Sequence, residues 1–236
     1  MDLKQQIRDR IGEGAAAQVW TPVDFLDLGS RDAVDKALQR LATARQLRRI
    51  DRGLYDVPRI SALTKQSAAP DYRQVLDAVT RRDQTRMLVD GLTAANDLGL
   101  TTAVPSRVVV HTDARRRSIH VGRLVIDFKQ TAPSKLYWAG RPAMRIVQAL
   151  HWLKDTLPSD RDRVADRLSA ILADPQHGPA LQADLRQGFV ALPTWMQTLL
   201  RPLLSPPLKT LQPGARRRRT QQRPEHRRIQ NAGTRP

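Results

Sequence analysis

Long side chains that donate hydrogen bonds gather between residues 31 and 52 of this sequence. Their positions are Arg31, Lys36, Gln39, Arg40, Arg48, Arg49 and Arg52. Arginine, lysine and glutamine can donate to base edges in the major groove of DNA, and the two cations also pair with phosphates. The same stretch carries Asp32 and Asp35, as an ordinary solvated helix face would. The residue types therefore indicate a nucleic-acid contact. Because acids lie among them, the types alone do not show which side chains would contact the bases.

A second group of side chains has the types needed to bind a metal ion. Asp113, Asp127 and Lys129 resemble the D…(D/E)xK arrangement of metal-dependent nucleases, in which two carboxylates hold Mg²⁺ and the lysine stabilises or activates the attacking water. The spacing fits loosely, and outward-facing charges on an amphipathic strand are the preferred interpretation. The five histidines share no metal-ligand spacing, and no Gly-rich phosphate loop, HExxH or GxSxG motif occurs. The sequence therefore predicts no enzyme, no cofactor and no metal site.

The elements expected to position the first group form a winged helix-turn-helix. Thr21 and Pro22 begin a short helix that ends near Leu28–Gly29. Ser30 caps a second helix, whose apolar residues recur with the helical period. Strands are expected at 47–50 and 54–57, with Gly53 supplying the positive φ of the turn between them.

In such a module the second helix lies in the major groove, and the hairpin is a wing that contacts phosphate or the minor groove. A helix over residues 3–11, with apolar residues at four-residue steps, would brace it. The alternative is a surface helix followed by a basic hairpin, which is a common arrangement. The order of the elements, the two caps and the arginine-bearing turn favour DNA binding over that alternative.

The remaining chain predicts a second domain. We expect a winged-helix domain at 1–60, a linker at 61–70, a domain at 71–204 and a disordered basic tail at 205–236. Helical patterning covers 72–79 and again 87–99, and helices are expected at 142–153, 164–172 and 193–204. Between them, strands at 108–112, 118–121 and 124–128 predict a three-stranded antiparallel meander. The predicted fold class is α+β and mostly helical, with a small antiparallel sheet and C-terminal helices.

Three adjacent arginines, Arg115, Arg116 and Arg117, occupy the tip of the first hairpin in this meander. Like charges placed together favour an exposed position and an anion that relieves their repulsion. DNA beyond the major-groove site, an acidic partner surface, or solvent and salt could supply that relief. We therefore treat these residues as a candidate second basic site.

Charge is distributed unevenly along the chain, whose net charge is +17. Residues 1–60 hold 11 Lys or Arg and 9 Asp or Glu, residues 61–204 hold 20 and 13, and residues 205–236 hold 9 and 1. Almost half of the excess positive charge thus lies in the tail. Such a balance favours a polyanionic partner. There is no cysteine, and no stretch resembles a signal peptide or a membrane span, so a cytoplasmic protein without membrane contact is expected.

Three separated blocks resemble one family. WTPVDFLDLGSRDAVDKALQRLATARQLRRIDRGLYDVPR looks like the N-terminal winged helix of the AbiEi antitoxins, which belong to type IV toxin–antitoxin and abortive-infection modules. LVDGLTAANDLGLTTAVPSRVVVHT and APSKLYWAGRPAMRIVQALHWLKD are similar to the second domain of that family. Agreement runs from about residue 3 to 175, and RGLYDVPR is its most distinctive part.

The resemblance implies a bacterial repressor that binds inverted repeats in double-stranded DNA upstream of its own operon. It also implies that the second domain counters a cognate nucleotidyltransferase toxin of the AbiEii type, without the need for a stable complex. Two alternatives remain open from the residues. One is a stand-alone winged-helix transcriptional regulator whose C-terminal domain senses a ligand or dimerises, and the other is the magnesium-dependent nuclease.

Overall fold

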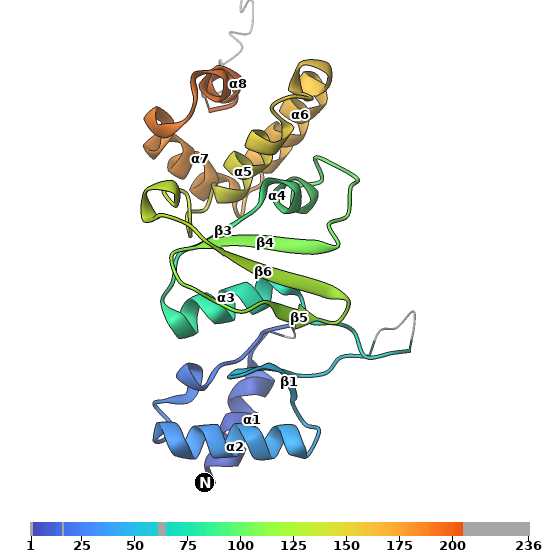
Figure 1. The fold of residues 1–236 in the computed structure, drawn as a ribbon, viewed down its shortest axis with the longest axis vertical. Coiled ribbons are helices and arrows are strands. Elements are labelled where there is room, and N and C mark those ends of the chain that lie inside the picture. Colours follow the sequence, from blue (N-terminus) through green and yellow to red (C-terminus); the bar gives the residue numbers. More distant parts are fainter. Residues whose placement is uncertain (1, 16, 61–64, 205–236) are drawn as a thin grey trace, which may run out of the picture. The chain divides into compact units, whose positions relative to one another are not determined.

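The computed structural model describes residues 2–15, 17–60 and 65–204 of the chain. These residues belong to one compact unit, and they confirm the predicted α+β, mostly helical class (Figure 1). The predicted tail at 205–236 and the first four positions of the predicted linker lie outside the described residues. The division into domains at 60 and 71 stays a prediction.

The N-terminal elements follow in the predicted order. They are α1 (Leu3–Glu13), the 3-10 turn η1 (Pro22–Phe25), α2 (Arg31–Thr43), β1 (Arg48–Asp51) and β2 (Leu54–Asp56). The short helix after Thr21 is a single 3-10 turn. At its start, the Asp24 carboxylate accepts both the backbone N–H of Thr21 at 2.7 Å and its hydroxyl at 3.0 Å. The predicted cap of α2 is confirmed, since Ser30 Oγ accepts the N–H of Ala33 at 3.4 Å.

Two apolar cores meet at the β1–β2 hairpin. The smaller core lies among the N-terminal elements and consists of Ile7, Trp20, Phe25, Val34, Ala37, Leu38, Leu41, Leu47 and Tyr55. Leu54 of β2, and Val19 in the segment before η1, instead belong to the larger core formed by the rest of the unit. The hairpin is therefore packed on both cores, which couples its position to residues far along the chain.

The second sheet differs from the predicted meander. Its strands are β3 (Met87–Val89), β4 (Arg107–Thr112), β5 (Ile119–Val121) and β6 (Leu124–Gln130), in the order β3-β4-β6-β5. β4 and β6 pair in parallel, and β5 pairs only with β6. The three-stranded antiparallel meander is therefore wrong, because the longest strand, β6, pairs with β4 and leaves the three-residue β5 at an edge.

Helices α3 (Tyr72–Asp83) and α4 (Gly91–Asp97) flank β3 in sequence. The predicted helix over 87–99 is wrong in its first part, where all three residues of β3 are buried. A strand buried on both faces has no alternation, so its pattern is the same as that of a short buried helix segment.

The C-terminal part is helical, with α4 packed against α5 (Figure 1). After the 3-10 turn η2 (Pro133–Lys135) come α5 (Met144–Leu153), α6 (Leu157–Leu172), α7 (Gly178–Gln187), the 3-10 turn η3 (Phe189–Ala191) and α8 (Thr194–Leu204). The three predicted helices here are confirmed, and α7 is additional. In the described ranges no helix is long and apolar enough to cross a membrane.

Candidate nucleic-acid interface

A polar pocket of about 230 Å³ lies between α2 and the β1–β2 hairpin. Four of the seven predicted DNA-binding side chains line it: Arg31, Gln39, Arg49 and Arg52. All four are exposed. The fold thus brings residues from the start and middle of α2 and from the hairpin to one surface, which we name the α2–wing pocket.

A second pocket, of about 340 Å³, continues this surface. It shares Arg31, Arg52 and Gly53 with the α2–wing pocket and adds Asp51, Arg82 and Asp83. Arg82 and Asp83 lie at the end of α3. The candidate interface is therefore not built by the first 60 residues alone.

One acid moderates the charge of the α2–wing pocket. Asp35 lines it and pairs with Arg31 at 2.9 Å, with both side chains about half exposed. Lys36 and Arg40 are exposed on α2 but do not line either pocket. An exposed pair of this kind contributes little to stability, so its main effect is on the charge that an anion would meet.

Arg48, which the sequence predicts as a DNA-binding residue, is partly buried and pairs within the fold. Its guanidinium pairs with Asp56, with Nε to Oδ1 at 2.9 Å and Nη2 to Oδ2 at 2.5 Å, and its Nη1 donates to the carbonyl of Ala68 at 2.8 Å. Arg48 and Asp56 are direct partners in the hairpin register, and the Asp56 side chain is only 8% exposed. Arg48 therefore links the hairpin to the segment that contains Ala68, whereas Arg49, the next residue along β1, is exposed.

The second basic site also needs correction, because Arg116 turns inward. Its side chain is 15% exposed, pairs with Asp83 and lies 6.0 Å from the ring centre of Phe128. The segment that carries it leads from β4 to β5, which do not pair, so it is not a hairpin tip. Only Arg115 and Arg117 remain exposed. Three adjacent arginines need not share one environment when a partly buried carboxylate lies within reach of one of them.

Asp83 is held between two arginines. Arg82 donates to it from Nε at 2.9 Å and from Nη2 at 2.7 Å, and Arg116 donates to it as well. Burial raises the pKa of Asp83, but the hydrogen bonds and charges of the two arginines outweigh burial and hold that pKa below its ordinary value. Asp83 therefore remains charged at neutral pH.

Helix α3 braces the N-terminal elements through two consecutive arginines that sequence reasoning missed. Arg82 Nη1 donates to the carbonyl of Arg52 in the hairpin turn at 2.5 Å. Arg81 Nη2 donates to the carbonyl of Val19 at 2.9 Å, and its Nε pairs with Asp24 at 3.3 Å. Cations at a helix C-terminus are favourable on their own, so the sequence carried no signal that these two reach another part of the chain.

The nuclease-like residues are not brought together. Asp113 accepts the N–H of Arg86 at 3.2 Å, while Asp127 accepts the hydroxyl of Ser118 at 2.5 Å and pairs with Arg107 at 2.8 Å. Asp127 lies opposite Val109 in the parallel register, four residues before Asp113. At the rise of a strand this separation is about 13 Å, too far for two carboxylates to share one ion. Among the described residues, no group of three or more His, Cys, Asp or Glu could hold a metal ion.

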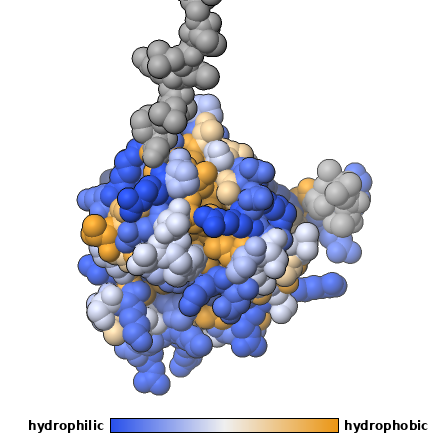
Figure 2. Space-filling model, turned by 90° about the horizontal axis from the view of Figure 1, so that it is seen from above, coloured by the Kyte–Doolittle hydropathy of each residue, from blue (hydrophilic) through white to orange (hydrophobic). Residues whose placement is uncertain are grey.

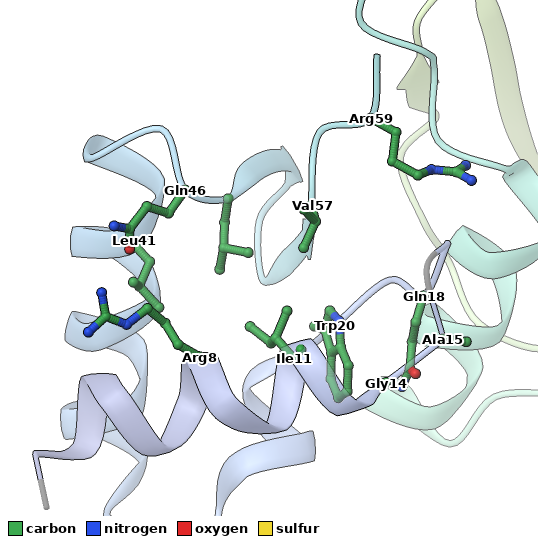
Figure 3. Close-up of a pocket in the computed structure, with 12 residues that line it drawn as sticks. Arg8, Ile11, Gly14, Ala15, Gln18, Trp20, Leu41, Gln46, Val57 and Arg59 are labelled. Carbon is green, nitrogen blue, oxygen red and sulfur yellow. The ribbon is translucent and has the colours of Figure 1, made fainter. Parts of the chain in front are cut away.

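A cavity of about 650 Å³ lies between α1, the end of α2 and the segment after β2 (Figure 3). Its walls are mainly apolar and include Ile11, Trp20, Leu41, Leu47 and Val57. The charged residues that line it are Arg8 and Arg59. Since neither a carboxylate nor a histidine lines it, the cavity offers no pair for acid–base chemistry.

Comparison with known proteins gives a family but no activity. No curated protein shows significant sequence similarity to this chain. A family described as being of unknown function, DUF6088, matches residues 6–173. The matched range contains all residues of the α2–wing pocket and ends with α6. Because the match covers more than half of the sequence, this chain belongs to the DUF6088 family of unknown function.

Proposed function

We propose that this protein binds double-stranded DNA through α2 and the β1–β2 hairpin, as a winged helix-turn-helix. The observation that carries the proposal is the α2–wing pocket, where Arg31, Gln39, Arg49 and Arg52 face one polar space. In the proposed complex α2 enters the major groove and Gln39 contacts a base edge. Arg49 and Arg52 of the hairpin pair with phosphates beside the groove.

The charge distribution supports a polyanionic partner. Residues 205–236 hold nine Lys or Arg and one Glu, so they add non-specific attraction to phosphate by counterion release. Arg115 and Arg117, both exposed, extend the positive charge of the folded part. Specificity in this proposal comes from α2, and the other cations contribute affinity that depends on salt.

The biological role that we propose is that of an antitoxin that represses its own operon in a bacterial cytoplasm. This part rests on the resemblance of three sequence blocks to AbiEi antitoxins. Residues beyond the hairpin would then counter a nucleotidyltransferase toxin, directly or through an indirect effect. A growth-rescue assay with a nucleotidyltransferase gene encoded next to this one would test this role, and it is independent of the binding test. DNA binding without rescue would instead favour the stand-alone regulator.

Fluorescence anisotropy with the DNA upstream of the gene tests DNA binding directly. The Arg49→Ala/Arg52→Ala double variant should reduce the salt dependence of log affinity by about two units of slope. The charge-matched control is Lys154→Ala/Arg161→Ala, which removes two exposed cations far along the chain and should keep the slope of the natural protein. Equal slopes in both variants would show that the hairpin does not contact DNA.

A further inference from the structure

We infer that the C-terminal helices form a binding site for a small amphipathic anion, a molecule with an apolar body and one negatively charged group. The site is a cavity of about 430 Å³ between the end of α5, the first turns of α6, and α8. Pockets that bind small molecules have volumes of roughly 300–1,000 Å³. The inference does not depend on DNA binding, since none of its residues belongs to the α2–wing pocket.

The walls of this cavity are apolar. They consist of Leu157, Pro158, Leu199 and the ring of Trp195. The imidazole of His151 packs edge to face against this indole, with ring centres 6.2 Å apart. Burial, and secondly the charge of Lys154, lower the pKa of His151, so the ring beside Trp195 is neutral at pH 7. The apolar walls come from both α6 and α8, so they can cover an apolar body on more than one side.

Two cations border the same cavity without a carboxylate. Lys154 and Arg161 both line it, and no acid is among its lining residues. Within the described part of the chain, neither forms an ion pair with any Asp or Glu. Two unpaired like charges beside an apolar wall favour an anion between them. The arrangement therefore complements both halves of an amphipathic anion.

The surface supports a ligand rather than the chain's own tail. Figure 2 looks onto the end of the molecule with the C-terminal helices and shows apolar residues in the middle of that face, bordered by hydrophilic ones. Residues 205–236 carry nine cations and one acid, so their charge does not complement that of Lys154 and Arg161. The cavity residues that α8 contributes, Trp195, Thr198 and Leu199, lie outside the range that the family model matches, which ends at residue 173.

Titration of the full chain with 8-anilinonaphthalene-1-sulfonate, an aromatic anion, tests the site. We expect saturable fluorescence enhancement at one site. Lys154→Gln/Arg161→Gln should weaken binding at least roughly tenfold, because it removes both charges. Thr198→Trp, a substitution at an exposed lining position, should abolish binding by filling the cavity. The uncharged analogue N-phenyl-1-naphthylamine should bind more weakly and should be insensitive to the charge substitution.

The Arg49→Ala/Arg52→Ala variant serves as the matched control and should bind the probe like the natural protein. Circular dichroism melting curves establish that each variant is folded. The inference is overturned if both cavity variants bind the probe with unchanged affinity, since the probe then binds elsewhere. It is also overturned if Thr198→Trp alone has no effect, because the apolar cavity is then not used. Displacement of the probe by duplex DNA would assign the two cations to a nucleic-acid surface and reject the site as well.

Discussion

At the scale of single residues, the environment of an arginine decides whether it is free to bind an anion. Arg48 and Arg49 are neighbours on β1, yet one pairs with Asp56 and the other is exposed. Strand alternation sends them to opposite faces, and the burial pattern of β1 shows that alternation. The sequence predicts that the hairpin is basic, but only the partner strand shows which guanidinium has a carboxylate beside it.

Asp35→Asn is predicted to strengthen DNA binding. The substitution removes the carboxylate that pairs with Arg31 in the α2–wing pocket, so one more cation is available to phosphate. Affinity should rise by roughly 3–10-fold at low salt, and the salt slope should steepen by about one unit. Anisotropy titrations at several salt concentrations measure both. Asp162→Asn on α6, also exposed, is the control, and an equal gain there would reflect net charge alone.

Arg48→Ala is predicted to destabilise the fold while leaving the salt dependence of DNA binding unchanged. The Asp56 side chain is 8% exposed and would lose its charged partner, which costs about 2–4 kcal/mol for a pair that solvent partly reaches. Urea unfolding measures the loss. The Arg48→Ala/Asp56→Asn double variant should recover part of it, because no unpaired charge remains. A flattened salt slope in a folded Arg48→Ala variant would restore Arg48 to the interface.

At the scale of elements, the amphipathic helices and the N-terminal hairpin were predictable, whereas strand partners were not. Helix α2 buries Val34, Ala37, Leu38 and Leu41 as its period predicts. Helix α7 was missed because only Gly178, Asp184 and Leu185 are buried in it, which leaves almost no apolar stripe. The parallel pairing of β4 and β6 depends on contacts across the sheet, and the alternation of one strand does not show which strand lies beside it.

The same limit applied to the candidate site. The sequence identified Arg31, Gln39, Arg49 and Arg52, which the fold gathers around one pocket. It gave no reason to select Arg81 or Arg82, because their acceptors outside α3 are the carbonyls of Val19 and Arg52 and the carboxylate of Asp24, which lies far away in the sequence. Backbone carbonyls are identical at every position, so such contacts leave no trace in residue type.

Acid should loosen the contact between α3 and the segment that carries Arg116. The pKa of Asp83 in the folded protein lies below its ordinary value of 3.8. The charge of Asp83 therefore stabilises the fold fully above pH 3.8. This stabilisation is lost as the pH falls from 3.8 through the lower pKa of the folded protein. Unfolding free energies of the natural protein and of Asp83→Asn, measured between pH 2 and 6, should converge at the acid end. Parallel curves would show that the charge of Asp83 adds no stability.

At the scale of the whole molecule, the first 60 residues depend on the rest. Val19 and Leu54 belong to the larger core, and Arg81 and Arg82 hold η1 and the hairpin turn. The predicted boundary near residue 60 follows composition, but buried contacts cross it. The DNA-binding surface that we propose is therefore a property of the complete unit.

A fragment of residues 1–60 is accordingly predicted to be unstable. Loss of the larger core exposes Val19 and Leu54, both fully buried in the whole unit, and burial of one such side chain is worth about 1.5–3 kcal/mol. The fragment should lack a cooperative thermal transition and should bind DNA far more weakly than the full chain. Circular dichroism and anisotropy measure the two properties. A cooperative transition together with full DNA affinity would establish an autonomous domain.

The four-stranded sheet has a consequence for how copies of this protein meet in solution. Its two edges are β3 and β5, each only three residues long. An edge strand recruits a neighbouring chain through its unpaired N–H and C=O groups, and short edges offer few of them. The β3 and β5 edges therefore give a second copy of the protein few backbone groups with which to pair.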